Sequence, residues 1–417
     1  MGEQKNTGLD ALDALIGEIL PGNRFYAEKF KPISGGPKFE SWDDYHSRMP
    51  FTTKRELVDD QAANPPYGSN LTYDLARYTR FSQTSATSGR PMLWLDSPES
   101  WNWMLRNWAR VYTAAEVGPG DRILFAFSFG PFLGFWTAFE AAASIGALCI
   151  PGGGLSTEGR LRRIVENEVT VVCCTPTYAL RLGEVAREEG IDLAGSALRK
   201  IIVAGEPGGS IAAIRNRIED TWPRARMFDH YGMTEIGPVA YEDPEDAGSL
   251  RIIEESLHAE IIDPDSGSAV ENGEMGELVL TNLGRTACPL LRYRTGDLVC
   301  ASRDADSGDL ILRGGILGRA DDMLIIRGVN VYPGAVDEVV RSIPEIDEYQ
   351  VNVGTTGSLA ELAIAIEMSG SDAASKIAER LQSALYVAFS LRINVAVAKP
   401  GSLPRFEMKA RRWIRNP

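Results

Sequence analysis

The sequence predicts an α/β fold with a large N-terminal domain of α/β layers, a small β-rich subdomain and a small α/β C-terminal domain. Three observations support this prediction. Apolar runs of strand length alternate with helical patterns between residues 122 and 205, short runs with tight turns follow Gly248, and a new α/β pattern begins after residue 322. A chain of 417 residues is long enough for two or more domains. We therefore predict an N-terminal domain at 1–320, a C-terminal domain at 321–417 and a boundary at about 319–322.

The N-terminal half begins with a helix and two short strands. Leu9, Leu12, Leu15, Ile16 and Ile19 mark one face of an amphipathic helix. The runs 77–83 and 92–95 are short, aromatic and alternating, so they predict two strands around a loop. The alternating region that follows predicts strands at 122–127, 148–151, 169–174 and 200–205, and helices at 132–145, 158–167 and 177–190. Such alternation is typical of a sheet covered by helices on both faces.

The second half contains turns first and a further α/β pattern later. Turn signals stand at 263–267 and 271–274, within the stretch that predicts the β-rich subdomain. The C-terminal pattern predicts strands at 323–326, 349–353, 362–367 and 393–397, with helices at 333–342 and 373–389. In open α/β sheets ligands bind outside the carboxyl ends of the strands, which is where residues 128–130, 205–207 and 231–232 fall.

Charge and hydropathy exclude two classes of partner. The chain has 57 acidic residues against 43 Lys and Arg, a formal net charge of -14. Binding to nucleic acid depends on a basic surface that neutralises phosphates, so we expect no nucleic-acid partner. We find no apolar run long enough to span a bilayer and no N-terminal signal, so we expect no membrane partner and a soluble, cytoplasmic protein.

The cysteines and histidines do not predict a metal centre. The five cysteines are an odd number in mostly apolar surroundings, without Cys-x-x-Cys spacing, and are typical of reduced core thiols. Only three histidines occur, His46, His230 and His258, so a histidine-rich metal site is excluded.

Residues 84–91 predict a phosphate-binding turn. Thr84, Ser85, Thr87 and Ser88 provide four hydroxyls, and Gly89 and Arg90 follow them between the two predicted short strands. Backbone N–H groups in such a turn, with hydroxyls and a cation, can hold a triphosphate. The Gly-Lys-Ser/Thr of a Walker P-loop and its helix are missing. An ordinary Ser/Thr/Gly-rich surface turn is the alternative interpretation.

Further motifs follow in a fixed order, and together they resemble a known family. They are Tyr231-Gly232-Met233-Thr234-Glu235, then 293–297 (YRTGD), then 318–322 (GRADD), and Lys409 near the C-terminus. This order resembles the adenylate-forming superfamily of acyl-CoA synthetases, luciferases and peptide-synthetase adenylation domains. The amino-acid sequences of segments 229–235 (DHYGMTE) and 319–333 (RADDMLIIRGVNVYP) are most similar to the phenylacetate-CoA ligase branch. The resemblance covers nearly the whole chain, from residue 25 to 409.

The chemistry that the resemblance implies is activation of a carboxylic acid. A carboxylate is a poor acyl donor, so it attacks the α-phosphate of ATP, pyrophosphate leaves and an acyl-adenylate remains. The site then needs donors for the phosphates, a metal, an acid for the ribose and a cation at the α-phosphate. The resemblance assigns ribose binding to Asp297, and a turn residue is the alternative.

The Tyr-Gly segment is expected to hold the adenine and the metal. Asp229 would accept from the adenine amino group, Tyr231 would stack on the ring, and Gly232 follows in the same motif. Glu235, after Thr234, would help to hold Mg²⁺, and both are candidate catalytic residues. The alternatives are a buried structural tyrosine and an exposed acid at the start of a helix.

The C-terminal motifs imply a mobile domain. The family places its catalytic lysine at the position of Lys409, where a compact ammonium suits the charge shared between carboxylate and α-phosphate. Asp321 corresponds to the hinge about which the C-terminal domain rotates, and Arg319 would hold ribose or phosphate during the turn. Gly328 would enter the thiol tunnel. A solvated charge run around Lys409 and an ordinary turn at Asp321 are the alternatives.

This sequence departs from the family pattern at a few positions. Ala86, Ser88 and Arg90 replace the usual glycine, threonine and lysine of the phosphate turn, and Met408 replaces the glycine before the lysine. Ala86 takes positive φ less readily than glycine. Some members of the branch carry a Cys/His metal site just after the Tyr-Gly motif, but residues 241–251 lack those ligands, so we predict no structural zinc.

The acyl pocket is expected between two segments at strand ends. Phe127, Phe129, Gly130 and Phe132 are candidate walls on one side, and residues Gly205, Glu206 and Pro207 stand on the other, near the cofactor. Aromatic side chains at a strand end suit a flat aryl acid, although they are equally common in a plain core.

The sequence therefore predicts an ATP-dependent, AMP-forming acid-thiol ligase for an aryl or arylacetic acid, with ATP, Mg²⁺ and coenzyme A as cofactors. One alternative passes the acyl group to a separate phosphopantetheinyl carrier protein. Another alternative is a non-catalytic homologue that only binds adenylates, and the departures from the family pattern at Ala86 and Met408 suggest it. The expected partners are a small aromatic carboxylic acid and coenzyme A or a carrier protein, and a homodimer is left open.

Overall fold

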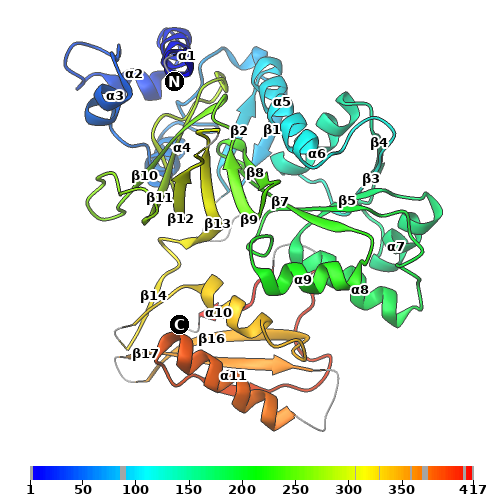
Figure 1. Cartoon of the computed structure of the whole chain (residues 1–417). Helices are drawn as coiled ribbons and strands as arrows, with labels where there is room; N and C mark the ends of the chain where they lie inside the picture. The colour runs from blue at the N-terminus through cyan, green and yellow to red at the C-terminus, as the bar shows by residue number, and fades with distance from the viewer. Residues whose placement is uncertain are drawn as a thin grey trace. The chain divides into compact units, whose positions relative to one another are not determined.

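The computed structural model describes residues 3–84, 91–305, 307–327, 329–356, 359–368, 374–406 and 410–415 (Figure 1). It is a mixed α/β structure with a sheet-rich N-terminal part and a separate C-terminal domain, as predicted. Its contacts form two groups, which we call unit 1 (Met1–Gly153 and His230–Arg313) and unit 2 (Gly154–Asp229 and Gly314–Pro417). The domain boundary at 320/321 stays a prediction.

Unit 1 begins with four helices, α1 (Glu3–Ile19), α2 (Arg24–Phe30), α3 (Trp42–Arg48) and α4 (Lys54–Ala63). The predicted amphipathic helix is confirmed, since its residues at 12, 15, 16 and 19 are buried in one apolar cluster with Tyr26 and Tyr45. Asn23, Ser41 and Thr53 cap the helices that follow them, each accepting a hydrogen bond from a backbone N–H of the first turn.

The predicted pair of short strands is present, with one shift. β1 (Arg80–Gln83) pairs antiparallel with β2 (Leu93–Asp96). Residues 75–77 form a short 3₁₀ helix, so the first strand begins three residues later than predicted. α5 (Pro98–Ala114) starts with a Ser97 cap and a proline in its first turn, and it buries Trp101, Trp103 and Trp108. Next come β3 (Arg122–Phe125), α6 (Leu133–Ser144) and β4 (Leu148–Pro151), and β3 and β4 are parallel.

The β-rich part of unit 1 consists of antiparallel strands. These are the second half of β7 (Arg226–Met233), β8 (Gly237–Asp243), β9 (Asp246–Ile252), β10 (Leu257–Ile262), β11 (Met275–Asn282), β12 (Tyr293–Arg303) and the start of β13 (Leu310–Arg319). β10, β11 and β12 are successive neighbours, as are β7, β8 and β9. The tight turn at 263–267 is confirmed, but β11, β12 and β13 have 8, 11 and 10 residues and are longer than the predicted short strands.

Unit 2 contains a parallel layer and the C-terminal domain. The layer has α7 (Thr157–Glu166), β5 (Val171–Cys174), α8 (Pro176–Glu188), β6 (Lys200–Val203) and α9 (Ala212–Thr221), with β5, β6 and the first half of β7 parallel. The predicted helices and strands of this region are confirmed to within a few residues.

The C-terminal domain follows the predicted α/β order and adds two short strands, at 329–331 and 413–415, that were not predicted. Its elements are β14 (Leu324–Ile326), β15 (Val329–Val331), α10 (Pro333–Arg341), β16 (Glu348–Thr356), β17 (Leu359–Glu367), α11 (Ala374–Phe389), β18 (Asn394–Val397) and β19 (Trp413–Arg415). The sheet order is β18-β17-β16-β19, and both helices contribute to one apolar core with Val336, Val351 and Leu381. β19 pairs parallel to β16, so the chain after Lys409 returns into this sheet.

The structure also bears on the predictions made for the cysteines and for membrane-spanning segments. All five cysteines lie among the described residues and are reduced thiols, as predicted, although Cys149 and Cys300 are only half-buried. Among the described residues, no helix has the length and apolar character that a membrane span requires.

Candidate functional site

Two predicted motifs meet in unit 1. Tyr231 in β7 donates a 2.5 Å hydrogen bond from its hydroxyl to Asp297 Oδ2 in β12, although the two residues are 66 positions apart. Asp297 is only 6% exposed, and its own N–H donates to Thr295 Oγ1 at 3.0 Å. Asp297 therefore lies inside a strand, and the alternative of a turn residue is wrong. Gly232 follows Tyr231 at an irregularity in the pairing of β7 with β8.

Asp229 lies two residues earlier in β7, at the carboxyl end of the parallel layer of unit 2. It pairs with Val203 of β6, and it is 8% exposed. A Cβ atom added to Gly209 would come within 1.9 Å of the Asp229 carboxylate carbon, so only glycine fits there. Gly205, directly after β6, has φ +95°, which allows the chain to turn at this strand end. The predicted strand-end location of these residues is thus confirmed, while their roles stay predictions.

Thr234 and Glu235 form the tight turn between β7 and β8, so the alternative of Glu235 at a helix start is wrong. Arg285 stabilises this turn, because its guanidinium donates to the Thr234 and Glu235 carbonyl oxygens at 2.8 Å each. The same guanidinium forms two 2.7 Å bonds with the Asp96 carboxylate, and both side chains are fully buried. Lys54 Nζ stands 3.7 Å from Glu235 Oε1. A single carboxylate on a fixed turn fits a magnesium ion that takes its other ligands from phosphate and water.

The predicted phosphate turn at 84–91 is described only at its two ends, Thr84 and Pro91. Thr84 is buried, accepts a 3.0 Å hydrogen bond from Met92 N at its hydroxyl, and donates its own N–H to Met92 O at 3.0 Å. It therefore closes the β1–β2 hairpin. Ser85, Thr87, Ser88, Gly89 and Arg90 lie outside the described residues.

The predicted acyl-pocket segment forms an aromatic cluster in unit 1. Phe127 lies 5.4 Å from Phe129 in a T-shaped contact and stacks on Phe135 at 4.1 Å. Phe132 meets Phe135 at 5.8 Å, also T-shaped. Gly130 has φ +50°, and a Cβ atom there would come within 3.1 Å of the Phe132 ring. Phe127 is buried and the other three rings are half-buried, so the cluster is partly core and partly accessible wall.

Several C-terminal candidates are only partly described. Arg319 forms a two-pronged pair with Asp321, with Nε to Oδ1 at 2.8 Å and Nη2 to Oδ2 at 3.2 Å. Both side chains are exposed, and residues 320–322 form a turn. Gly328 and Lys409 lie outside the described residues, but Ala410, next to Lys409, donates its N–H to Glu206 Oε2 at 2.8 Å.

Sequence reasoning missed Arg285, Asp96 and Lys54. Each is a common residue type without a motif around it, and the Arg285–Asp96 pair joins positions 189 apart. The only available signal was a charged residue in an apolar context, such as Asp96 after the strand run Leu93-Trp94-Leu95. Such a residue is buried only with a partner, but the sequence does not name the partner.

Two of the three histidines meet in unit 1 away from these motifs. His46 Nε2 and His258 Nε2 are 2.8 Å apart, and Glu260 Oε2 lies 3.6 Å from His46 Nε2. The ring centroids are 5.1 Å apart, so the two nitrogens face each other head-on as in a hydrogen bond. A zinc ion bonds imidazole nitrogen at about 2.0–2.1 Å and does not fit between them unless the rings turn. The Glu260 carboxylate is also paired with the Arg292 guanidinium, at 2.7 Å. The prediction of no structural zinc after the Tyr-Gly motif stays a prediction.

Two protein-family models match the chain. The AMP-binding enzyme model matches residues 83–285, and the AMP-binding enzyme C-terminal domain matches residues 328–416. Phenylacetate-coenzyme A ligase of Thermus thermophilus is 32% identical to this chain over 96% of it and 92% of that protein. Phenylacetate-coenzyme A ligase of Escherichia coli is 31% identical over 92% of this chain and 88% of that protein.

A solved structure is similar over the same length. The crystal structure of 2-hydroxyisobutyryl-CoA ligase in the postadenylation state, in complex with 2-HIB-AMP, has a TM-score of 0.93 and 26% identity. The match covers 99% of this chain and 90% of that chain.

Proposed function

The chain belongs to the phenylacetate-coenzyme A ligase family of AMP-binding enzymes, and on this basis we propose that it converts an aryl or arylacetic acid into its coenzyme A thioester. The acid attacks the α-phosphate of ATP, pyrophosphate leaves, and the acyl-adenylate formed is then attacked by the thiol of coenzyme A, which releases AMP. Relatives that match nearly the full length of the chain, at both its AMP-binding and its C-terminal parts, support this reaction.

The observation that carries the proposal is the contact between Tyr231 and Asp297. It joins the two motifs that the reaction needs for adenine and ribose, and it fixes the orientation of a buried carboxylate. A carboxylate has about four lone-pair positions, so Asp297 can accept from the Tyr231 hydroxyl and still receive both ribose hydroxyls. An acid held in this way binds ribose without first paying the cost of ordering its own side chain.

The remaining roles are proposed from the family resemblance together with the positions of those residues that the structure describes. Asp229, at the end of the parallel layer, would accept from the adenine amino group. Glu235, on the turn fixed by Arg285, would hold Mg²⁺, which lowers the negative charge of the phosphates when it is bound with ATP. Lys54, whose ammonium lies 3.7 Å from Glu235, would partly balance the negative charge of this carboxylate. Lys409 would stabilise the charge that develops between the carboxylate and the α-phosphate.

The aromatic cluster favours an aryl substrate. Phe129 and Phe132 are half-buried beside the buried Phe127, and a planar acyl group gains edge-to-face contacts from such rings in addition to its buried area. The two phenylacetate-coenzyme A ligases support the same substrate class at 32% and 31% identity, whereas the structurally similar 2-hydroxyisobutyryl-CoA ligase is 26% identical.

A panel of acids tests the proposal. Purified protein is incubated with ATP, Mg²⁺ and one acid, and pyrophosphate release is measured for phenylacetate, benzoate and 2-hydroxyisobutyrate. Coenzyme A is then added and the thioester is identified by mass spectrometry. We expect the aryl acids to be preferred and an acyl-CoA to form. Pyrophosphate release without any acyl-CoA would favour a carrier protein as the acceptor, and no release with any acid would contradict the reaction itself.

A further inference from the structure

The turn that carries Glu235 depends on a partner from elsewhere in the fold. Ile236, the last residue of the turn, is fully buried, and Glu235 itself is only 8% exposed. A backbone carbonyl removed from water needs a hydrogen-bond donor. The carbonyl oxygens of Thr234 and Glu235 share one donor nitrogen, Arg285 Nη1, at 2.8 Å each. The position of the turn therefore follows the position of the Arg285 guanidinium.

Asp96 holds the other edge of this guanidinium. Arg285 Nε and Nη2 donate to Asp96 Oδ1 and Oδ2 at 2.7 Å each, and both side chains are 0% exposed. Two parallel bonds of this kind fix the plane of a guanidinium as well as its place. Asp96 ends β2, its carbonyl oxygen accepts from Thr79 N at 3.0 Å, and Ser97 caps α5. The carboxylate is therefore carried by the junction of a strand and a long helix.

The backbone around Arg285 is fixed on the same helix. Ala287 N donates to Ser100 Oγ, in the first turn of α5, at 3.0 Å. A Cβ atom added to Gly284 would come within 2.4 Å of the Trp103 ring of α5, so only glycine fits on that side of Arg285. Both partners of the ion pair are thus held by α5.

The pair also sets the charge beside the turn. Burial alone would lower the pKa of Arg285, but the Asp96 carboxylate raises it above its ordinary value, and Glu235 acts in the same direction. The guanidinium therefore stays charged. An uncompensated positive charge bonded to the backbone of Glu235 would repel a metal cation at that residue. Because Asp96 neutralises Arg285, the turn receives its donors without this repulsion.

A second ion pair in unit 1 has the same construction and provides a comparison. Arg292 forms two bonds with the Glu260 carboxylate, at 3.0 and 2.7 Å, and the two side chains are 7% and 8% exposed. Its Nη1 donates to the carbonyl oxygens of His46 and Met49, at the end of α3. The donors of Arg292 therefore hold a helix end, whereas those of Arg285 hold the turn of a predicted metal ligand.

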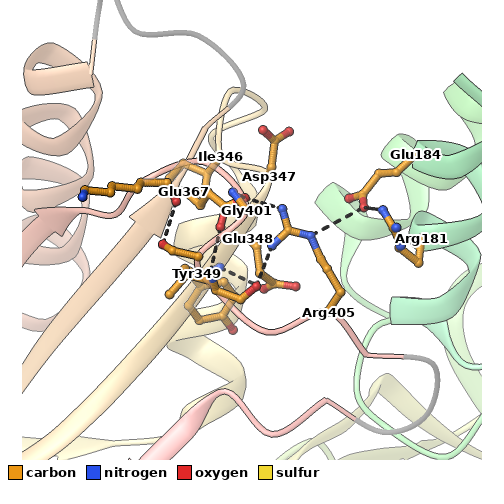
Figure 2. A network of polar contacts seen from close by, with 12 residues as sticks. Arg181, Glu184, Ile346, Asp347, Glu348, Tyr349, Glu367, Gly401 and Arg405 are labelled. Carbon is orange, nitrogen blue, oxygen red and sulfur yellow. Dashed lines mark hydrogen bonds and ion pairs between the residues drawn. The ribbon is translucent and has the colours of Figure 1, made fainter. Parts of the chain in front are cut away.

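Charges in unit 2 include a pair that is more open to water. Figure 2 shows Arg405 between the carboxylates of Glu367 and Glu184, and 29% of its side chain is exposed. Water can replace a partner at such a place, so a pair there contributes little to stability. Breaking the fully buried pair of Arg285 and Asp96 should instead disturb the turn, because water cannot replace either partner.

We propose that Asp96 and Arg285 are positioning residues for the magnesium site, and that together they set the affinity of Glu235 for the cation. This rests on the proposed function. Arg285 fixes the turn through its backbone, and Asp96 orients and neutralises Arg285. Mg²⁺ requires near-ideal octahedral geometry, so a carboxylate ligand must be held in place before the ion arrives. Removing a group that holds a metal ligand typically weakens metal binding by about 10- to 100-fold.

The test replaces the pair and measures the dependence on MgATP. A single substitution to an apolar residue leaves a buried charge without its partner and can unfold the protein, so the main variant is Asp96→Leu/Arg285→Met, with apolar side chains of similar length at both places. Pyrophosphate release is measured with saturating acid over a range of MgATP concentrations. The KM for MgATP should rise by about 10- to 100-fold, while kcat stays within about threefold.

A second variant and two readouts without turnover support this measurement. Arg285→Lys keeps the charge but replaces the planar fork with one ammonium, so it should raise the KM by a smaller factor. Hydrogen–deuterium exchange of peptides covering 229–243, without ligand, should be faster in both variants, because the turn has lost bonds. The affinity for AMP in the presence of EDTA, measured by isothermal titration, should stay within about twofold, since no metal takes part.

Controls separate this inference from the proposed function. Glu260→Leu/Arg292→Met replaces the comparison pair in the same way and should leave the KM for MgATP unchanged. Glu235→Gln tests the metal ligand itself. If Glu235→Gln raises this KM while Asp96→Leu/Arg285→Met has wild-type KM and exchange, the positioning role is refuted and the proposed function stands. If Glu235→Gln has a normal KM, the role of Glu235 as metal ligand fails first. Loss of AMP affinity together with kcat in Asp96→Leu/Arg285→Met would mean a merely structural role and overturn the inference.

Discussion

Removing one oxygen atom from Tyr231 should weaken nucleotide binding while the fold stays intact. In Tyr231→Phe the ring keeps its position in β7, but the 2.5 Å bond to Asp297 is lost. The Asp297 carboxylate is 6% exposed, so little water can replace the hydroxyl. A hydrogen bond to a charged group contributes about 1.5–3 kcal/mol, which corresponds to about 10- to 100-fold in affinity if the bond serves mainly to orient the ribose acceptor.

Isothermal titration of the variant with ATP and with AMP measures this effect, and pyrophosphate release follows its consequence for turnover. Both nucleotides should weaken equally, because each carries the same ribose. Tyr241→Phe, on the neighbouring strand β8, is the matched control and should bind like wild type. Asp297→Ala should weaken binding at least as much, with an unchanged far-UV spectrum. Unaltered ATP affinity in a folded Tyr231→Phe protein would refute the view that this pair forms the ribose site.

Three further outcomes follow from the same geometry and chemistry. Lys409→Ala should cut acyl-adenylate formation by about two to four orders of magnitude, the scale of losing a transition-state charge contact, and spare thioester formation from presynthesised adenylate. Asp321→Pro should fix the backbone of the turn at 320–322, so pyrophosphate release should persist while the thioester yield falls; near wild-type rates of both would leave Asp321 an ordinary turn residue. Burial lowers the pKa of His230 to about 4. The unfolded chain, with a histidine pKa of about 6.5, therefore binds a proton that the fold does not between pH 6.5 and 4. The free energy of unfolding should fall by about 3 kcal/mol over this window. Urea titrations at pH 7 and pH 5 should show a smaller loss in His230→Gln than in wild type, and an equal loss would contradict the assignment.

The elements could be predicted from the sequence because their signals are local. The helices at 333–341 and 374–389 and the strands of the parallel layer lie within a few residues of their predicted positions, since apolar period, caps and glycines all act over one or two turns. The first strand was predicted three residues too early, because an aromatic, alternating run does not reveal that residues 75–77 close a 3₁₀ turn. The strands after Gly248 were predicted too short for a similar reason. Their polar residues look like turn residues in the sequence, but in the structure they form hydrogen bonds across the sheet.

The site could be predicted only as a set of separate motifs, and the reason is distance along the chain. A motif gives the residue type and the strand end, as it did for Asp229, Tyr231 and Asp297, but not which oxygen meets which donor. The bonds that organise the site join positions 66, 189 and 204 residues apart. Glu206 illustrates the limit: in sequence it is an acid after a glycine, and it fits a cofactor wall or a loop equally well. The structure places Thr177 N and Ala410 N on its two carboxylate oxygens, and the sequence predicts neither bond.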